Sequence, residues 1–325
     1  MRAWLKERIR RARIWWGLRV ANPYPETLPN PPLVPIGPRQ QAAIDGLETV
    51  GIFLGPYRNL TTLSAAILYL HPECQVLNHA GPRTLDDPAL NFFTDYDEDK
   101  FRAFCHFGLT MSQGGARGSY GGSVLLAHAY ADHGPMRRAF LQRFGATTRK
   151  PEVKSLVWKE SQRVTHLLRS DAADLEELLA RNARLRFLLP IRNPIDCAHS
   201  LARLGMTRVY GEQTRGQVLH VLDMILDDMH WFLEWQARYP QRFFHFYQNQ
   251  LNADTLNDLA AFLKLPQDQR WIDDTLSIYR LRAPYDYEQG VRAHYQQRVE
   301  QLFGARPKIL EDFMSFSQPV ERELA

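Results

Sequence analysis

Short apolar runs alternate with amphipathic stretches along most of the chain. The runs at residues 49–55, 74–79, 186–191 and 242–248 have the length of buried strands and are apolar almost throughout. Helical spacing follows at 61–71, from Pro194 onward and at 212–238, and helices are also expected over most of 80–183 and after 248. This alternation predicts an α/β fold: a three-layer sandwich with a central parallel sheet.

The first 46 residues have a different pattern. Residues 1–22 place tryptophan, leucine and isoleucine at helical spacing beside a rim of arginine and lysine. Such a cationic amphipathic helix can lie on an anionic membrane surface through residues 1–20, or it can dock on its own domain. Residues 23–46 are rich in proline and predict an extended connector without a helix. The folded domain is therefore expected to span 47–325.

Composition narrows the class of protein. The chain has 325 residues, 45% of them hydrophobic, and a formal net charge of +4, which is too mild for nucleic-acid binding but suits a small anionic ligand. Three widely spaced cysteines and the lack of a secretory signal argue against a disulfide framework and against a zinc site. No apolar run is long enough to span a bilayer. We therefore expect a cytoplasmic protein, with peripheral contact to the inner membrane face as the alternative for residues 1–20.

A first candidate loop, "PYRNLTTL", occupies residues 56–63 between the first strand and its helix. The carboxyl ends of parallel strands face helix N-termini, whose free amides and positive dipole attract anions. Arg58, Thr61 and Thr62 can bind phosphate oxygens there, or the two threonines can simply cap the helix. A GxxxxGK[ST] loop is absent, as is an acidic strand end to hold magnesium.

A second candidate loop, "RNPIDCAHS", occupies residues 192–200 after the strand at 186–191. Arg192 ends the strand, Pro194 suits the first helical position, and Ser200 lies two turns inside the helix. Arg192 and Ser200 can converge on one phosphate. Alternatively, this is an ordinary strand–turn–helix joint in which Arg192 pairs with Asp196.

Together the two loops resemble those of sulfotransferases that use 3′-phosphoadenosine 5′-phosphosulfate (PAPS), especially bacterial and carbohydrate sulfotransferases. The second loop matches the pattern RNPxDxxxS at every defined position, and "YRNLTTL" is similar to the family's PRSGTTL. Weaker similarity at residues 157–168 and 246–266 extends the resemblance over about 48–266. It implies the P-loop-like sulfotransferase fold. Two departures stand out, because Leu60 replaces a glycine and no C-terminal RKGxxGDWK segment is present.

The resemblance also implies roles for individual residues. Arg192 and Ser200 are assigned to the 3′-phosphate of PAPS, and adenosine 3′,5′-bisphosphate is the expected product, with no metal. The residues assigned to the 5′-phosphosulfate are Arg58, Asn59, Leu60, Thr61, Thr62 and Leu63.

The sequence identifies the general base and the residues near the acceptor less clearly. His79, at the end of the strand at 74–79, is the first candidate for the base, because an imidazole titrates near neutral pH. Lys159 follows an apolar strand-like run and either lies beside the sulfuryl group or is an exposed lysine at a helix start. The glycine-rich loop, residues 112–123 around Arg117 and Tyr120, is either a lid or a connector. The reserve candidates for the base are His106, Glu160 and Asp95.

The predicted function is therefore transfer of a sulfuryl group to a hydroxyl of a carbohydrate or glycolipid acceptor. Two rival functions stay open. A nucleotide-dependent phosphotransferase would need the magnesium ligands that the sequence lacks. A catalytically degenerate, membrane-peripheral protein would keep the fold to bind a nucleotide or a glycan, with Leu60 having closed the donor site.

Overall fold

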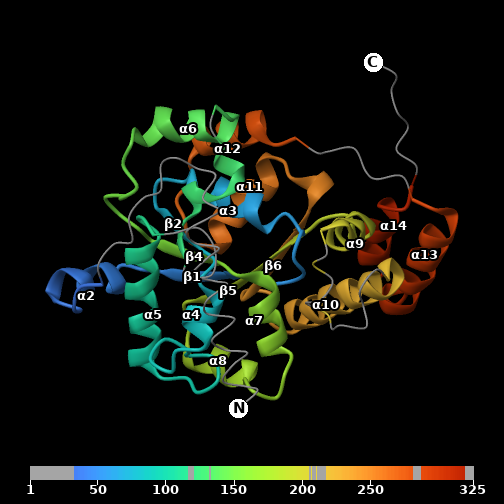
Figure 1. Ribbon diagram of the computed structural model, residues 1–325, viewed down its shortest axis with the longest axis horizontal. Coiled ribbons are helices and arrows are strands. Elements are labelled where there is room, and N and C mark those ends of the chain that lie inside the picture. Colours follow the sequence, from blue (N-terminus) through green and yellow to red (C-terminus); the bar gives the residue numbers. More distant parts are fainter. Residues whose placement is uncertain are drawn as a thin grey trace, which may run out of the picture.

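A six-stranded sheet forms the centre of the computed structural model, which describes residues 33–115, 121–131, 133–204, 206, 210, 217–280 and 287–318. The strand order is β3-β2-β4-β1-β5-β6, and all neighbours are parallel except β3, which runs antiparallel to β2 (Figure 1). The strands are β1 (Thr49–Phe53), β2 (Cys74–Asn78), β3 (Gly122–Ser123), β4 (Ser155–Lys159), β5 (Leu185–Ile191) and β6 (Phe243–Tyr247).

Helices cover both faces of the sheet. Alternate residues of the strands enter two separate apolar clusters, as Ile52 and Phe53 of β1 do. Ile52 belongs to the cluster that also contains residues of α5 (Glu98–Met111), α7 (Ser161–Leu168), α8 (Leu175–Arg181) and α10 (Val218–Arg238). Phe53 belongs to the cluster on the other face, which contains residues of α3 (Thr61–Tyr69), α6 (Pro135–Phe144), α11 (Ala253–Phe262) and α12 (Gln269–Ile278). The prediction of a three-layer α/β fold is confirmed.

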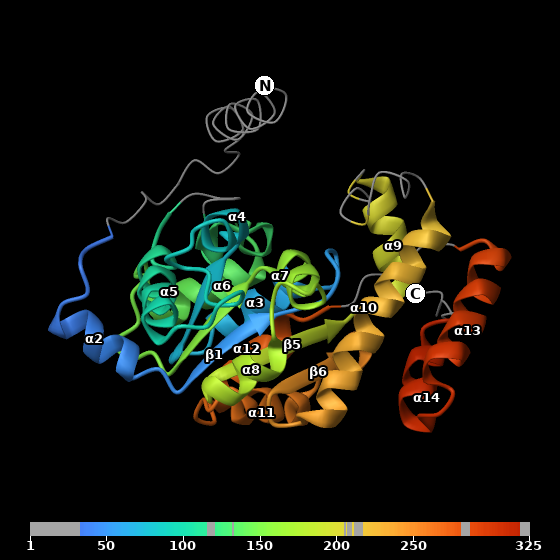
Figure 2. The same cartoon turned by 90° about the horizontal axis from the view of Figure 1, so that it is seen from below.

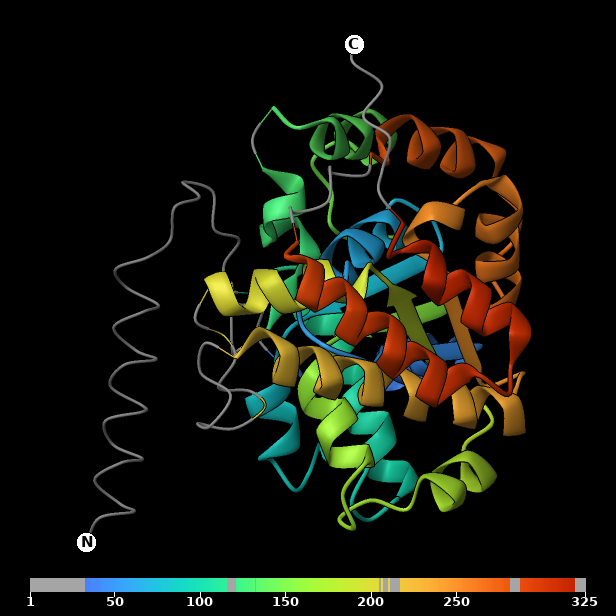
Figure 3. The ribbon, with the colours of Figure 1, turned by 90° about the vertical axis from the view of Figure 1, so that its right-hand side faces the viewer.

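Four further helices lie around these layers. Figure 2 shows α9 (Pro194–Arg203) beyond the carboxyl end of β5. Figure 3 shows α13 (Gln289–Phe303) along α10, and α14 (Pro307–Ser315) packed on α13. A short helix, α4 (Gly81–Leu85), follows β2. None of the helices in the described ranges is long and apolar enough to cross a membrane. The predicted amphipathic helix at 1–22 lies outside the described residues.

The prediction of helices over most of 80–183 did not include the strand β4. It recognised only an apolar, strand-like run before Lys159. That run is β4, and it lies between β1 and β2 in the middle of the sheet. All five of its residues are buried, but only the three between Ser155 and Lys159 are apolar, so the run is too short to stand out from the helices around it.

The predicted connector also needs correction, because α2 (Pro38–Asp45) is a helix inside it. Pro38 occupies the first turn, where its missing N–H is not needed, and the Gly37 amide donates to Gln40 Oε1 at 3.2 Å. Ile44 is buried against the main core, so this part of the segment belongs to the domain.

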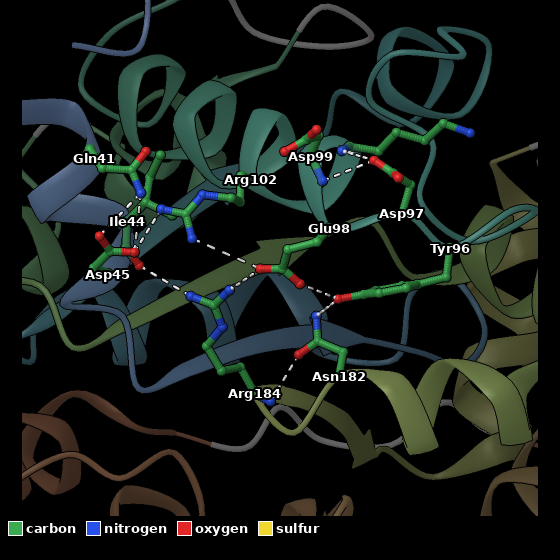
Figure 4. A network of polar contacts seen from close by, with 11 residues as sticks. Gln41, Ile44, Asp45, Tyr96, Asp97, Glu98, Asp99, Arg102, Asn182 and Arg184 are labelled. Carbon is green, nitrogen blue, oxygen red and sulfur yellow. Dashed lines mark hydrogen bonds and ion pairs between the residues drawn. The ribbon is translucent and has the colours of Figure 1, made fainter. Parts of the chain in front are cut away.

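A polar network fastens α2 to the amino edge of the sheet (Figure 4). Arg184 donates to Ile44 O at 3.2 Å and to Glu98 Oε1 at 2.9 Å, and Arg102 donates to Asp45 Oδ1 at 2.6 Å. Tyr96 donates its hydroxyl to Glu98 Oε2 at 2.7 Å. These side chains join α2, α5 and the start of β5 at the edge opposite the two candidate loops.

Candidate active site

The β1–α3 loop, residues 54–60, makes a tight turn through left-handed backbone conformations. Gly55, Arg58 and Leu60 have φ angles of 92°, 67° and 59°. A Cβ on Gly55 would lie 2.3 Å from Leu189 Cδ1, so the close approach of the loop to β5 requires glycine there. Leu60, which replaces the glycine of the sulfotransferase pattern, adopts a conformation that favours glycine. The leucine therefore takes a backbone conformation that a glycine would adopt at lower cost.

The N-terminus of α3 offers unpaired donors at the carboxyl edge of the sheet. Leu60 is the N-cap residue and makes no side-chain cap, and the first intrahelical bond runs from Ser64 N to Leu60 O. The amides of Thr61, Thr62 and Leu63 belong to the first turn, where no helical carbonyl can accept them. With the positive end of the helix dipole, these amides form a suitable anion-binding surface.

The second loop is built as the sequence predicted. Asn193 caps α9 by accepting from Ile195 N at 3.0 Å, and Pro194 takes the first helical position. Ser200 is 1% exposed and lies two turns inside α9. Arg192 is half-buried at the end of β5, with Nη2 at 3.6 Å from Asp196 Oδ2.

The two loops meet through Arg58. Its Nε donates to Ser200 Oγ at 2.9 Å, and Arg192 Nη1 donates to the Arg58 carbonyl at 3.2 Å. Arg58, Arg192 and Ser200 thus form one cluster at the carboxyl ends of β1 and β5. The long contact between Arg192 and Asp196 shows that the alternative pairing also exists.

Asn59 was predicted to bind the 5′-phosphosulfate, but the structure gives it another role. The side chain is fully buried, its Nδ2 donates to Pro190 O, and its Oδ1 accepts from Arg192 N at 2.8 Å. Both ends of the amide are therefore engaged with β5 and the residue that follows it. Asn59 fastens the first loop to the second.

Lys159 lies beside this cluster as the last residue of β4, which excludes its interpretation as an exposed lysine at a helix start. It is 5% exposed. Burial lowers the pKa of Lys159 to about 8, with the Glu160 carboxylate opposing the shift and the Arg58 guanidinium adding to it. The structure therefore brings a third cationic group to the edge where Arg58 and Arg192 meet.

His79 occupies the end of the neighbouring strand β2. Its amide donates to Lys159 O at 3.0 Å, and its carbonyl accepts from Trp158 Nε1 at 2.5 Å. His79 and Ala80 are both in the left-handed region, with φ angles of 61° and 79°. These backbone bonds hold the half-buried His79 next to β4, at the same edge as Lys159.

Of the three reserve candidates for the base, Glu160 lies at this edge, next to Lys159, and the other two lie elsewhere. Glu160 is buried and both of its carboxylate oxygens accept hydrogen bonds, Oε1 from the Tyr57 hydroxyl at 3.2 Å and Oε2 from Gly81 N at 3.0 Å. His106 Nε2 lies 2.6 Å from Val34 O, and the exposed Asp95 pairs with Lys100 at 2.9 Å.

The glycine-rich loop is only partly described, because Arg117 and Tyr120 lie in the range 116–120 outside the described residues. Its last part is not free to act as a lid, since Gly122 and Ser123 form β3 and pair with Asn78 and Leu77. Gly121 has a φ of 79°, and a Cβ there would lie 2.4 Å from Ala80 Cβ.

The sequence analysis did not identify the side chains that hold the two loops in place through hydrogen bonds. Gln162 and Thr165 on α7 accept hydrogen bonds from the amides of Tyr57 and Gly55. On the other side, Tyr287 donates its hydroxyl to Asp196 Oδ1 at 2.6 Å and accepts from Asn193 Nδ2 at 3.1 Å. The only available signal was the three-residue spacing of Gln162 and Thr165 on a helix that begins at a strand end.

Metal-ligating side chains are not grouped near this cluster. Across the described ranges, no three histidine, cysteine, aspartate or glutamate side chains are placed to hold one metal ion. Cys74, Cys105 and Cys197 are free, buried thiols. Cys197 Sγ lies 3.5 Å from the Arg58 carbonyl.

Comparisons with known proteins give similarity in structure alone. No protein-family model matches the chain, and no curated protein matches it in sequence. Among solved structures, sulfotransferase STF9 from Mycobacterium avium aligns at 13% identity over 81% of this chain and 79% of its own, with a TM-score of 0.39. The sulfotransferase domain of the Synechococcus PCC 7002 olefin synthase aligns at 13% identity over 78% and 80%, with a TM-score of 0.34. Because these scores are low, the fold assignment depends on the strand order and connections of the chain itself.

Proposed function

We propose that the chain is a sulfotransferase that moves the sulfuryl group of PAPS to a hydroxyl of an acceptor. The observation that carries this proposal is the convergence of Arg58, Arg192 and Ser200, from loops at opposite ends of a 142-residue interval, beside the N-terminus of α3. Cationic and neutral donors at the carboxyl edge of a parallel sheet are suited to a ligand with two anionic groups.

The donors present fit such a ligand. For a 3′-phosphate, Arg192 provides a guanidinium and Ser200 a hydroxyl. For a 5′-phosphosulfate, the first turn of α3 provides amides and Arg58 a second cation. The set consists of nitrogen donors and hydroxyls without a carboxylate cluster, so it is suited to a bound anion and not to a hydrated cation.

PAPS would supply the sulfuryl group, held by a phosphosulfate bond that breaks during transfer. Arg58 and Lys159 stabilise the negative charge that develops on the leaving oxygen, and the amides of Thr61 and Thr62 orient the anion. His79 takes the proton of the acceptor hydroxyl as its oxygen bonds to sulfur. No metal is required for this sequence of roles.

The acceptor in this proposal is a carbohydrate or glycolipid hydroxyl. Residues 1–20 would bring the enzyme to an anionic membrane surface, which suits a lipid-linked acceptor. Deletion of residues 1–22 is expected to abolish binding to vesicles that contain phosphatidylserine and to leave nucleotide affinity unchanged. Unchanged vesicle binding would refute the membrane role of this segment.

The first experiment is calorimetric titration of adenosine 3′,5′-bisphosphate into the full chain without added metal. Micromolar binding is expected for the wild type and at least tenfold weaker binding for Arg192→Ala, since a charge-assisted hydrogen bond is lost. The control is Arg181→Ala, which removes an exposed arginine paired with Glu177 on α8.

Three outcomes separate the rival functions. Saturable binding that depends on Arg192 excludes a donor site closed by Leu60. No binding by the wild type overturns the proposal. Transfer activity that disappears with a chelator would indicate a metal-dependent phosphotransferase, because sulfuryl transfer by this site needs no metal.

A further inference from the structure

The first half of the β1–α3 loop gives its backbone amides to α7. Gly55 N donates to Thr165 Oγ1 at 2.7 Å, and Tyr57 N donates to Gln162 Oε1 at 3.0 Å. Between them, Pro56 has no amide proton. Every N–H of residues 55–57 is therefore satisfied by a buried side chain of one helix.

The two acceptors on α7 are fixed in that role. Gln162 Nε2 lies 3.3 Å from Asp228 Oδ2 and 2.8 Å from His166 Nε2, so the nitrogen side of the amide faces two acceptors and the oxygen side faces Tyr57 N. Thr165 donates its hydroxyl proton to Ser161 O at 3.1 Å, which leaves a lone pair for Gly55 N.

Asp228 on α10 holds the Gln162 side chain in this orientation. The side chain is buried, and it also accepts from Arg169 Nη1 and from the Tyr210 hydroxyl, the latter at 3.3 Å. Burial raises the pKa of Asp228, an effect that the Arg169 guanidinium opposes. A continuous chain of hydrogen bonds therefore runs from α10 through Gln162 to the loop.

We propose that Gln162 and Thr165 are positioning residues for the anion site. By holding the amides of residues 55–57, they set where the loop turns, and thus where Arg58 and the free amides of the first turn of α3 lie. This inference rests on the proposed function, because it takes the nucleotide as the ligand of that site. Neither residue contacts the ligand itself.

The test compares substitutions that remove the acceptor with one that keeps it. Thr165→Val removes the hydroxyl at nearly constant volume, Thr165→Ser retains it, and Gln162→Met removes the amide at similar length. The matched controls are Gln75→Met in β2 and Thr275→Val in α12, both buried and both away from the loop. Each variant is titrated with adenosine 3′,5′-bisphosphate, and its thermal unfolding is recorded.

We expect affinity to fall about tenfold in Thr165→Val and in Gln162→Met, because a buried amide is left without a partner and the loop shifts to find one. Thr165→Ser should bind close to the wild type, and both controls should bind as the wild type does even where they unfold earlier.

Wild-type affinity in a folded Thr165→Val protein would overturn the positioning role and leave the proposed function intact. Equal losses in Thr165→Val and Thr165→Ser would also overturn it, because the hydroxyl would then not be the relevant group. A wild type that fails to bind the nucleotide would instead overturn the proposed function, and with it this inference.

Discussion

Arg58 donates through its Nε to the hydroxyl of Ser200, 142 residues further along the chain, at 2.9 Å. Each of these residues belongs to a loop that resembles half of a nucleotide site, and the contact shows that the halves share one cluster. Since residues in direct contact couple energetically, the pair can be tested as a unit.

Ser200→Ala and Arg58→Ala are each expected to weaken binding of adenosine 3′,5′-bisphosphate by about tenfold or more. The double variant should lose less than the sum of the two free-energy changes, because the first substitution already removes the contact. Calorimetric titration of all four proteins gives the coupling energy. Strict additivity would show that the contact between the two side chains does not contribute to nucleotide binding.

Leu60→Gly should stabilise the protein or leave its stability unchanged, and it should bind the nucleotide as tightly as the wild type or more tightly. The reason is the φ of 59°, which costs a leucine about 1 kcal/mol and costs glycine almost nothing. Leu63→Gly is the contrast, because glycine inside a helix lowers stability by about 1 kcal/mol. Chemical denaturation measures both. Weaker nucleotide binding by Leu60→Gly would mean that the leucine side chain itself contributes to the site.

Nucleotide affinity should fall as the pH rises through about 8. Burial lowers the pKa of Lys159 to about that value, so the ammonium form that attracts an anion is present below it and lost above it. In Lys159→Arg the side chain stays charged, and the affinity should change much less between pH 7 and pH 9. Lys159→Met should bind weakly and show little dependence on pH over this range. Parallel curves for all three proteins would place the titrating group elsewhere.

Low pH should destabilise the fold because the buried, neutral ring of His71 becomes protonated. Its Nε2 lies 3.0 Å from Pro266 O and its Nδ1 accepts from Glu73 N at 3.2 Å, an arrangement that requires the neutral ring. Burial lowers the pKa of His71 to about 4, below the ordinary value of about 6.5. The unfolded chain therefore binds more protons in this window, and stability is lost as the pH falls from about 6.5 towards 4.

His71→Gln is expected to cost about 1–3 kcal/mol at pH 7 and to reduce the loss of stability between pH 6.5 and pH 4. The measurement is urea denaturation at several pH values. The control is His220→Gln, which changes an exposed histidine on α10 and should leave the pH dependence unchanged. An unaltered pH profile in His71→Gln would contradict the assignment.

Local pattern was sufficient for four of the six strands and for the second loop. The strands β1, β2, β5 and β6 lie where apolar runs predicted them, and Arg192, Pro194 and Ser200 occupy the predicted positions on β5 and α9. In each case the signal is contained within about ten residues of chain, so no distant contact had to be known.

The residues that the sequence analysis misjudged have roles that depend on contacts with distant parts of the chain. Asn59 fits a phosphate loop by position, but its partners Pro190 and Arg192 are 131 and 133 residues away, and they decide its role. The supporting acceptors Gln162 and Thr165 were missed for the same reason. The strand β4 was obscured because its apolar run is only three residues long, with Ser155 before it and Lys159 after it.

The position of β1 has a consequence for synthesis of the protein. Its register partners Ser155 and Leu185 belong to β4 and β5, so β1 leaves the ribosome long before either neighbour exists. At roughly 5–20 residues per second, the 142 residues from Arg58 to Ser200 take roughly 7 to 30 seconds to make. The cluster of Arg58, Arg192 and Ser200 cannot assemble during that interval. A nascent chain shorter than 200 residues therefore lacks the complete cluster, and a ligand of the proposed anion site could stabilise the fold only after α9 has emerged.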